Sequence, residues 1–223
     1  MNVTVIDYKA GNLTSVVKAL RYLGANVTIT DRPEDVAKAS RVVLPGVGHF
    51  AATRRLDETG ITQAVREIIT RGVPFLGICV GMQWLLRGST EAPLQAGLGH
   101  FTGLCERFPE GQEKVPHVGW NQILARTLPP SRLFAGMEEQ QNQSVYFTHS
   151  YYVPMTTLYV PKGFRTADLS SPQIANPMAA LTTYIGRQHF MSAVEHDNVM
   201  GVQFHPEKSG ETGLKILKNF LQF

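Results

Sequence analysis

Apolar residues follow two different periods along the first hundred positions of the chain. Short, mostly apolar runs typical of strands buried on both faces of a sheet lie at 3–7, 26–30, 41–44 and 73–78. Between these runs, apolar side chains recur every three or four positions, which predicts helices over 13–23, 31–38, 61–70 and 79–86. Because strands alternate with helices, this part of the chain predicts an α/β fold with a mostly parallel sheet and helices on both faces.

The pattern changes in the second half of the chain, where the segments are shorter and richer in β-branched and aromatic residues. Strands that extend the sheet in an antiparallel manner are predicted at 100–108, 144–153, 189–197 and 199–205. The last segment, 210–223, has apolar residues at helical spacing and predicts a closing amphipathic helix. Residues 154–177 are rich in Pro, Ser and Thr, which predicts a long surface excursion.

The amino-acid composition limits the cellular environments and the functional classes that are expected for the protein. Apolar residues make up 43% of the 223 positions, enough to fill one large core. The formal charge is small, 21 − 18 = +3, and its basic residues are not clustered, so no nucleic-acid partner is expected. The start of the chain lacks the pattern of a leader and no run of about 18 apolar residues occurs, which predicts a soluble, cytoplasmic protein with no membrane segment. The two cysteines, Cys79 and Cys105, are too few for a disulfide framework, and no spacing predicts a bound metal.

The most informative stretch for chemistry is Gly77-Ile78-Cys79-Val80-Gly81, where an apolar strand runs into a helix. Small residues two positions before and after a cysteine allow a turn tight enough to expose the thiol. The start of the following helix favours the thiolate form, so Cys79 is the candidate nucleophile. The alternative is a buried cysteine at a strand end, between two glycines that serve only packing.

A thiol nucleophile needs a base, and the best-placed histidine is His205 in the segment GVQFHPE. The apolar strand ends there, and Glu207 lies two positions further on, where its carboxylate can orient the imidazole. Alternatively, the histidine and the glutamate are merely solvated in a surface turn. His49, which has no such carboxylate nearby, is a weaker candidate, and His196 is expected in a β-turn.

A third feature is the segment PGVG at 45–48, which follows the third predicted strand. Its glycines leave the backbone N–H groups of Val47 and Gly48 free to point at a developing oxyanion, together with the N–H of Val80 after the nucleophile. The alternative is a plain turn with positive φ angles. Cys105 has no glycine turn around it and is expected to be a small core residue.

These stretches occur in an order that resembles the triad glutamine amidotransferases, in which a cysteine attacks the side-chain amide of glutamine. Within that class, the chain more specifically resembles the glutaminase subunit of imidazole glycerol phosphate synthase. This resemblance is carried by VTVIDYKAGNLTSV, PGVGHF, GICVGMQWL, PHVGWN, YFTHSYY and GVQFHPEKSG, which span nearly the whole chain. The resemblance implies one flavodoxin-like class I domain over 1–223 that hydrolyses glutamine without a cofactor.

The resemblance also implies roles for individual residues. It implies a triad of Cys79, His205 and Glu207, and an oxyanion hole of Val47, Gly48 and Val80. Residues that would hold glutamine are Gln83, His149, Ser150 and Tyr151. Residues that would face a cyclase subunit, in a heterodimer that receives the ammonia for histidine biosynthesis, are Asn12, Trp120, Tyr146 and Lys208. From the residues alone, Gln83 can also face solvent, Tyr151 can pack on the core, and Trp120 can be a core residue.

Two features depart from the family's usual pattern. Residues 155–183 form a longer and more polar connection than expected, and His49 follows PGVG where a small residue is usual. Two other functions stay open at this point: a glutaminase for another synthase, and a flavodoxin-like binding protein without catalysis.

Overall fold

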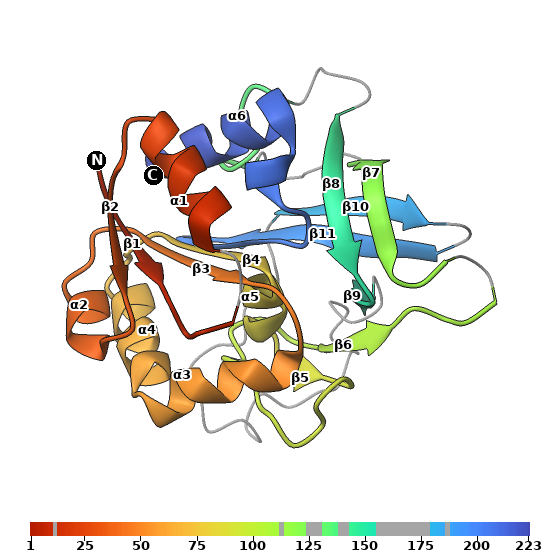
Figure 1. The fold of residues 1–223 in the computed structure, drawn as a ribbon, viewed down its shortest axis with the longest axis horizontal. Helices are drawn as coiled ribbons and strands as arrows, with labels where there is room; N and C mark the ends of the chain where they lie inside the picture. Colours follow the sequence, from red (N-terminus) through yellow and green to blue (C-terminus); the bar gives the residue numbers. More distant parts are fainter. Residues whose placement is uncertain (11–12, 112–113, 124–130, 138–142, 155–178, 186–187) are drawn as a thin grey trace.

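A mixed β-sheet runs through the computed structural model, which describes residues 1–10, 13–111, 114–123, 131–137, 143–154, 179–185 and 188–223. Its strand order within these residues is β2-β1-β3-β4-β12-β11-β9-β6-β5, and β10 pairs with β11 beside this path. The sheet divides into a parallel half and an antiparallel half (Figure 1). No helix among the described residues is long and apolar enough to cross a membrane.

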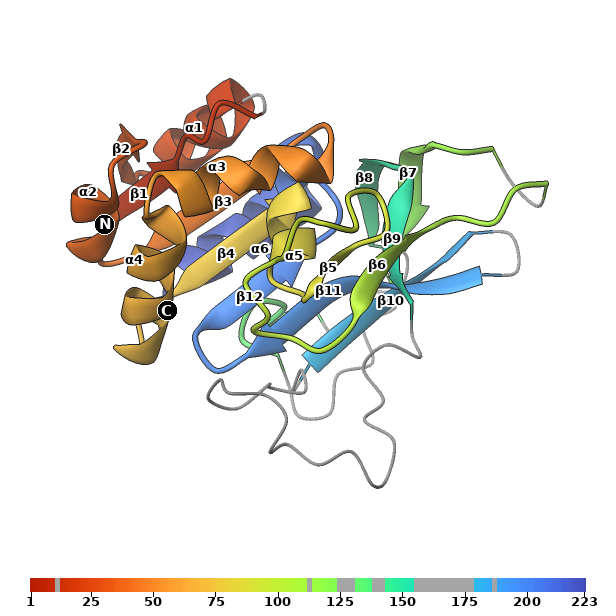
Figure 2. The same ribbon diagram turned by 90° about the horizontal axis from the view of Figure 1, so that it is seen from below.

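The parallel half follows the predicted alternation of strands and helices. Its strands are β1 (Asn2–Ile6), β2 (Asn26–Thr30), β3 (Val42–Gly46), β4 (Phe75–Cys79) and β12 (Val199–Val202). One face carries α1 (Leu13–Tyr22) and α6 (Gly210–Leu221), and the other carries α2 (Pro33–Ala37), α3 (Arg54–Glu58), α4 (Ile61–Thr70) and α5 (Val80–Trp84) (Figures 1 and 2). Every residue of β3 and β4 is buried, as expected for strands covered on both faces.

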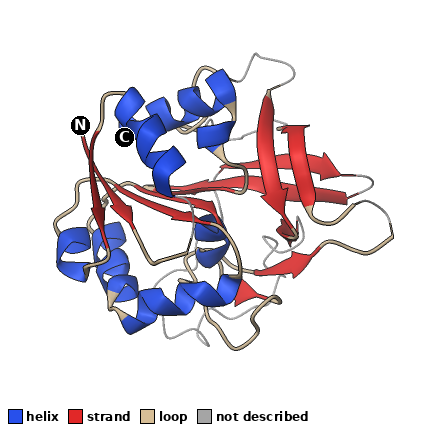
Figure 3. Ribbon diagram, viewed as in Figure 1, coloured by secondary structure: helices blue, strands red, loops and turns tan. Residues whose placement is uncertain are grey.

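The antiparallel half consists almost entirely of strands (Figure 3). Its strands are β5 (Gly88–Ser89), β6 (Leu104–Arg107), β9 (Tyr151–Pro154), β10 (Ala179–Ile185) and β11 (Gln188–His196). Their pairings are antiparallel except for the short parallel pair of β5 with β6. A separate two-stranded antiparallel sheet is formed by β7 (His117–Gln122) and β8 (Ser144–His149), and we count it with the antiparallel half of the molecule. Between the two sheets, Phe147 and Phe190 are fully buried and pack against the rings of His117 and His149.

Several predictions for this half need correction. The predicted strand 144–153 is broken at Ser150, and its first part pairs with β7 instead of extending the main sheet. The last predicted strand ends at Val202, so residues 203–205 leave the sheet. Strand β10 begins at Ala179, inside the connection 155–183. Apart from Pro154, the predicted surface excursion at 154–177 lies outside the described residues. The 3₁₀ turn η1 (Phe50–Thr53), α3, β5 and β7 were not predicted.

Candidate active site

The turn between β4 and α5 has an unusual backbone at Cys79. Its φ of 54° and ψ of −110° lie in a region that residues with a Cβ rarely adopt. The flanking glycines are required, because a Cβ on Gly77 would overlap the carbonyl of Gly81 and one on Gly81 would overlap the carbonyl of Leu44. Such strain costs about 1–3 kcal/mol and is typical of functional positions. The turn therefore combines close glycine packing with a strained cysteine, rather than packing alone.

His205 follows β12 and lies in a buried pair with Glu207. Its Nδ1 is 2.8 Å from Oε1 of Glu207, and the two side chains are only 2% and 3% exposed. Burial alone would lower the pKa of His205, but the neighbouring Cys79 and the Glu207 carboxylate favour the imidazolium and raise the pKa to about 10. The other ring nitrogen, Nε2, is buried and makes no hydrogen bond within the described part of the chain. The pair is not solvated, so the surface-turn alternative is wrong.

A pocket of about 250 Å³ opens beside Cys79. It is lined by eight residues that the sequence singled out, namely Val47, Gly48, Cys79, Val80, Gln83, His149, Ser150 and Tyr151. The remaining lining residues are Glu91, Pro116 and Thr148. Side chains from the parallel half, the loop after β5 and strand β8 thus meet at one place.

The PGVG segment lies next to the cysteine turn because β3 pairs with β4. Gly46 is the register partner of Cys79, so Val47 and Gly48 continue past the end of the sheet into the pocket. A Cβ on Gly46 would overlap the hydroxyl of the buried Tyr8, which explains a glycine at this position. The backbone is therefore close enough to contribute to an oxyanion site.

Gln83 is buried and does not face solvent. Its Nε2 donates hydrogen bonds of 3.0 Å to the carbonyl of Tyr151 and of 3.0 Å to Oε1 of Gln203. Tyr151 is only partly buried and lines the pocket. His149 is buried, and its Nδ1 lies 2.8 Å from the same Tyr151 carbonyl. The Tyr151 carbonyl thus joins the α5 side of the pocket to its β8 side.

Two residues near the pocket were missed by sequence reasoning. Glu91 places a carboxylate in the pocket, and its Oε2 accepts a 2.8 Å hydrogen bond from the backbone N–H of Phe50. Gln203 is fully buried, and its Nε2 lies 3.5 Å from the Cys79 sulfur. Glu91 lies in an irregular loop that gives no periodic signal. Gln203 does have a signal, because it lies two positions before His205 in GVQFHPE.

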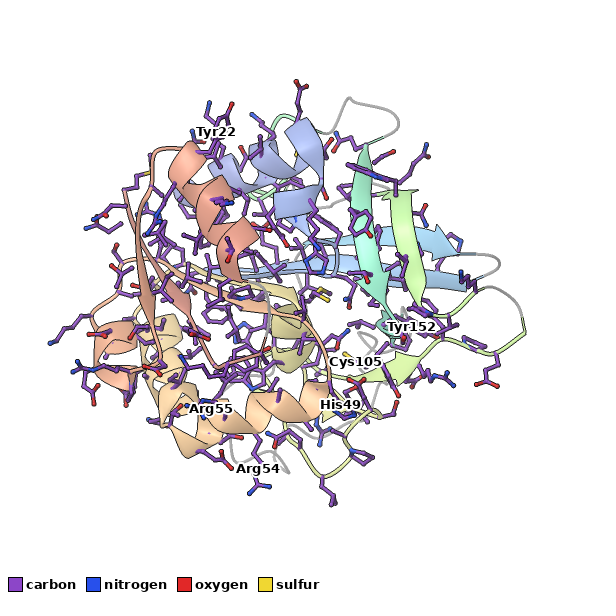
Figure 4. The ribbon with its side chains drawn as sticks, in the orientation of Figure 1. Tyr22, His49, Arg54, Arg55, Cys105 and Tyr152 are labelled. Carbon is purple, nitrogen blue, oxygen red and sulfur yellow. The ribbon has the colours of Figure 1, made fainter. Side chains whose placement is uncertain are left out.

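The weaker candidates lie elsewhere. His49 is exposed at the start of the helical segment that leads into α3 (Figure 4), and its Nδ1 accepts a 3.1 Å hydrogen bond from the N–H of Ala51. Cys105 is fully buried, which confirms the core prediction, and burial raises the pKa of its thiol. His196 is the last residue of β11 rather than part of the turn. In the described residues no group of three or more His, Cys, Asp and Glu side chains could hold a metal ion.

Three of the four residues predicted to face a partner form one surface cluster. Trp120 is 59% exposed, which excludes a core position, and its ring centroid is 6.1 Å from that of Tyr146. The Lys208 ammonium lies 5.8 Å from the centre of the Tyr146 ring. The backbone N–H of His205 donates a 2.8 Å hydrogen bond to the carbonyl of Tyr146. The fourth predicted residue, Asn12, lies outside the described residues.

Comparison with known proteins gives consistent matches along the whole chain. The family described as glutamine amidotransferase class-I matches residues 4–223. The imidazole glycerol phosphate synthase subunit HisH of Geobacter sulfurreducens is 41% identical over 225 residues, covering 98% of this chain and 97% of that protein. The same-named subunit of Moorella thermoacetica is 42% identical over 98% of this chain and 93% of its own length.

A longer relative and a solved structure extend these comparisons. The imidazole glycerol phosphate synthase hisHF of Schizosaccharomyces pombe is 39% identical over 99% of this chain, which spans only 38% of that protein. The structure of PurLQS from Thermotoga maritima aligns with a TM-score of 0.69 at 18% identity, over 99% of this chain and 97% of the other. At that identity the likeness concerns the fold alone.

Proposed function

The chain belongs to the class-I glutamine amidotransferase family, and from this premise we propose that it hydrolyses glutamine and supplies the ammonia to the cyclase subunit of imidazole glycerol phosphate synthase. It would do so as part of a cytoplasmic heterodimer in histidine biosynthesis. The observation that carries the proposal is the strained Cys79 turn beside the buried His205–Glu207 pair. Relatives named as subunits of this synthase, about 40% identical over almost their whole length, support the choice of acceptor enzyme.

The reaction begins with attack of the Cys79 thiolate on the side-chain amide carbon of glutamine. The oxyanion that forms is stabilised by the backbone N–H groups of Val80, Val47 and Gly48, which line the same pocket. His205, held as an imidazolium by Glu207, gives its proton to the departing ammonia. The neutral imidazole then takes a proton from the water that hydrolyses the γ-glutamyl thioester, which releases glutamate and restores the thiolate.

Glutamine is held by groups on both sides of the pocket. Gln83, His149, Ser150 and Tyr151 form one wall, with polar backbone and side-chain atoms for an amino acid. The Glu91 carboxylate supplies the negative charge that the α-ammonium of the substrate requires. The pocket is therefore suited to a small zwitterion with an amide at one end.

We place the partner surface at Trp120, Tyr146 and Lys208. Asn12, the fourth residue predicted to face the partner, lies outside the described residues. Aromatic anchors beside a cation are typical of stable interfaces. The hydrogen bond between Tyr146 and the backbone of His205 supports a link between docking and catalysis. We expect weak hydrolysis by the chain alone and stimulation when the cyclase carries its nucleotide substrate.

A paired assay tests the proposed function. Cys79→Ala in complex with the cyclase should abolish imidazole glycerol phosphate formation from glutamine and leave formation from added ammonia within about twofold of the wild type. Cys105→Ala, which changes the other thiol, should leave both activities in place. Retention of the glutamine-dependent reaction by Cys79→Ala would reject the nucleophile. Loss of the ammonia-dependent reaction as well would argue against a purely ammonia-supplying role.

A further inference from the structure

A buried amide next to the nucleophile has no part in the mechanism so far. Gln203 is fully buried directly after β12, and its Nε2 donates a 3.5 Å hydrogen bond to the Cys79 sulfur. Its Oε1 accepts a 3.0 Å hydrogen bond from Nε2 of Gln83. Both ends of this side chain are therefore engaged, one of them with the reacting atom.

The orientation of this amide is fixed by a single backbone carbonyl, that of Tyr151. A carbonyl oxygen can only accept hydrogen bonds, so the group of Gln83 that faces it at 3.0 Å must be the NH₂ group. The same NH₂ group reaches Oε1 of Gln203. The Gln203 side chain is thereby left with its own NH₂ group facing the sulfur.

The same carbonyl also fixes the tautomers of two buried histidines. Nδ1 of His149, 2.8 Å away, must donate to Tyr151, so Nε2 of His149 accepts from Nδ1 of His117 at 3.2 Å. Nε2 of His117 then accepts from the side-chain nitrogen of Asn121 at 3.3 Å. An ordered chain of hydrogen bonds thus runs from β7, the strand of Trp120, to the Tyr151 carbonyl and on to the nucleophile.

Burial keeps both histidines neutral, and this row of hydrogen bonds requires neutral rings. Desolvation lowers the pKa of His149 to about 3 and that of His117 to about 4. A protonated ring would place a second N–H where its neighbour needs an acceptor. The donor and the acceptor of each of these hydrogen bonds therefore stay the same throughout the neutral pH range.

We propose that Gln203 is a further catalytic residue, whose N–H stabilises the Cys79 thiolate before attack and again when the sulfur leaves the γ-glutamyl thioester. The Tyr151 carbonyl sets this orientation of the Gln203 amide through Gln83, and the hydrogen bonds from Asn121 through His117 to His149 hold that carbonyl in place. No proton moves along this chain. In the leaving step the water oxygen bonds to the acyl carbon, the carbon–sulfur bond breaks, sulfur keeps the electron pair, and His205 takes the proton of water.

This inference rests on the proposed function, because it assigns Cys79 as the nucleophile. Its test is the rate at which iodoacetamide alkylates Cys79 between pH 5 and 10, compared in the wild type and in Gln203→Leu. The other titratable groups that act on this sulfur are His205 with Glu207, Tyr8 and Cys105, and all of them remain in the variant. Loss of a charge-assisted N–H donor should raise the midpoint of the profile by about one to two pH units.

Gln143→Leu is the matched control. Gln143 is also a buried glutamine, but its Nε2 donates to the carbonyl of Met137 instead of the sulfur. The Gln143→Leu variant should lose about as much stability as Gln203→Leu and should keep the wild-type alkylation profile of Cys79. With glutamine as substrate and loaded cyclase present, Gln203→Leu should lower kcat about 10- to 100-fold with little change in KM. If Gln203→Leu does not fold, Gln203→Met, which keeps an unbranched chain of similar length, carries the same test.

The row of hydrogen bonds from Asn121 to the Tyr151 carbonyl is tested separately at His117. His117→Phe cannot donate to His149 and should shift the midpoint in the same direction by a smaller amount, whereas His117→Gln, which can donate and accept, should restore it. An unchanged midpoint in the Gln203 variants overturns the role of Gln203 even when Cys79→Ala is inactive. A wild-type Cys79 that resists alkylation, with full activity in Cys79→Ala, overturns the proposed function instead.

Discussion

The parallel half and the antiparallel half of the molecule each bring a buried histidine to the candidate site, and the pKa values of the two histidines are shifted in opposite directions. His205, in the parallel half, has a pKa raised to about 10, whereas His149, in the antiparallel half, has a pKa lowered to about 3. Both rings are almost fully buried. The difference lies in their polar partners, because His205 is next to a carboxylate and a thiol, whereas the ring nitrogens of His149 face a carbonyl and another histidine.

The comparison shows that burial alone does not determine the charge of a histidine. Desolvation lowers the pKa of both rings, and at His205 the neighbouring Cys79 and Glu207 overcome this effect. A charged ring with a free Nε2 is suited to proton transfer, while a neutral ring of fixed tautomer is suited to positioning. We therefore assign acid–base chemistry to the parallel half and substrate positioning to the antiparallel half.

The largest expected effect contrasts the two histidines directly. His205→Gln removes the proton donor and should lower the glutaminase kcat of the loaded complex by about 10³- to 10⁴-fold. His149→Gln retains hydrogen-bonding groups and should leave kcat within about tenfold while raising KM for glutamine. Steady-state glutamate release measures both. Equal losses of kcat in the two variants would remove the distinction between the halves.

Glu207→Gln tests the carboxylate that raises the pKa of His205 above that of His149. The variant keeps the shape of the side chain but loses its charge, so the pKa of His205 should fall towards 6.5 and kcat should drop by about 10²-fold or more. NMR titration of the ring and glutaminase kinetics measure the two effects. Asp197→Asn is the matched control, because Asp197 is also a carboxylate next to a histidine, with its Oδ2 3.6 Å from Nδ1 of His196, and neither residue lines the pocket. A pKa of His205 that does not move would show that Glu207 is not its stabiliser.

A smaller effect is expected at the partner surface of the antiparallel half. Trp120→Ala should weaken cyclase binding by about 10- to 30-fold, because exposed aromatic anchors often contribute about 2 kcal/mol at interfaces. The stability of the isolated chain should change by no more than about 0.5 kcal/mol. Calorimetric titration and denaturant unfolding measure these quantities. Ile29→Ala, an exposed position on the opposite edge strand β2, should leave cyclase binding unchanged.

The smallest effect concerns the dependence of stability on pH. His100, His117 and His149 have lowered pKa values, so the unfolded chain binds more protons and stability should fall as pH drops from about 6.5 towards 4. His205 has a raised pKa, so its contribution is complete below about pH 6.5 and is lost as pH rises towards 10. Urea unfolding across this range should give a maximum near neutral pH. His100→Gln should reduce the slope of the unfolding free energy against pH on the acid side only, by at most about 1.4 kcal/mol per pH unit, without loss of activity.

The sequence predicted the parallel half better than the antiparallel half. The bounds of β2 and α4 agree with the prediction residue by residue, because local apolar periodicity determines strands and helices covered by one core. The β7–β8 pair was missed, since it joins His117 to His149 and depends on a register that no local pattern contains. The break at Ser150 separates two strands whose apolar pattern reads as one.

The candidate site shows the same division. The residues beside strand ends, such as Cys79 and His205, could be named because a motif reports both their chemistry and their place in the fold. Glu91 could not, because a carboxylate in an irregular loop gains its significance only from contacts made in three dimensions. Gln203 lies inside the segment GVQFHPE, but its hydrogen bond to the Cys79 sulfur is visible only in the fold.

Covalent trapping with a diazo-ketone analogue of glutamine tests the central claim, that Cys79 is the nucleophile of a glutamine site, most directly. Trypsin separates the two thiols into peptides 72–87 and 88–107, so mass spectrometry can assign the adduct. With loaded cyclase present, we expect modification of Cys79 alone, protection by glutamine, and strong loss of labelling in His205→Gln. An unmodified Cys79, or an adduct on Cys105 that glutamine does not prevent, would contradict it.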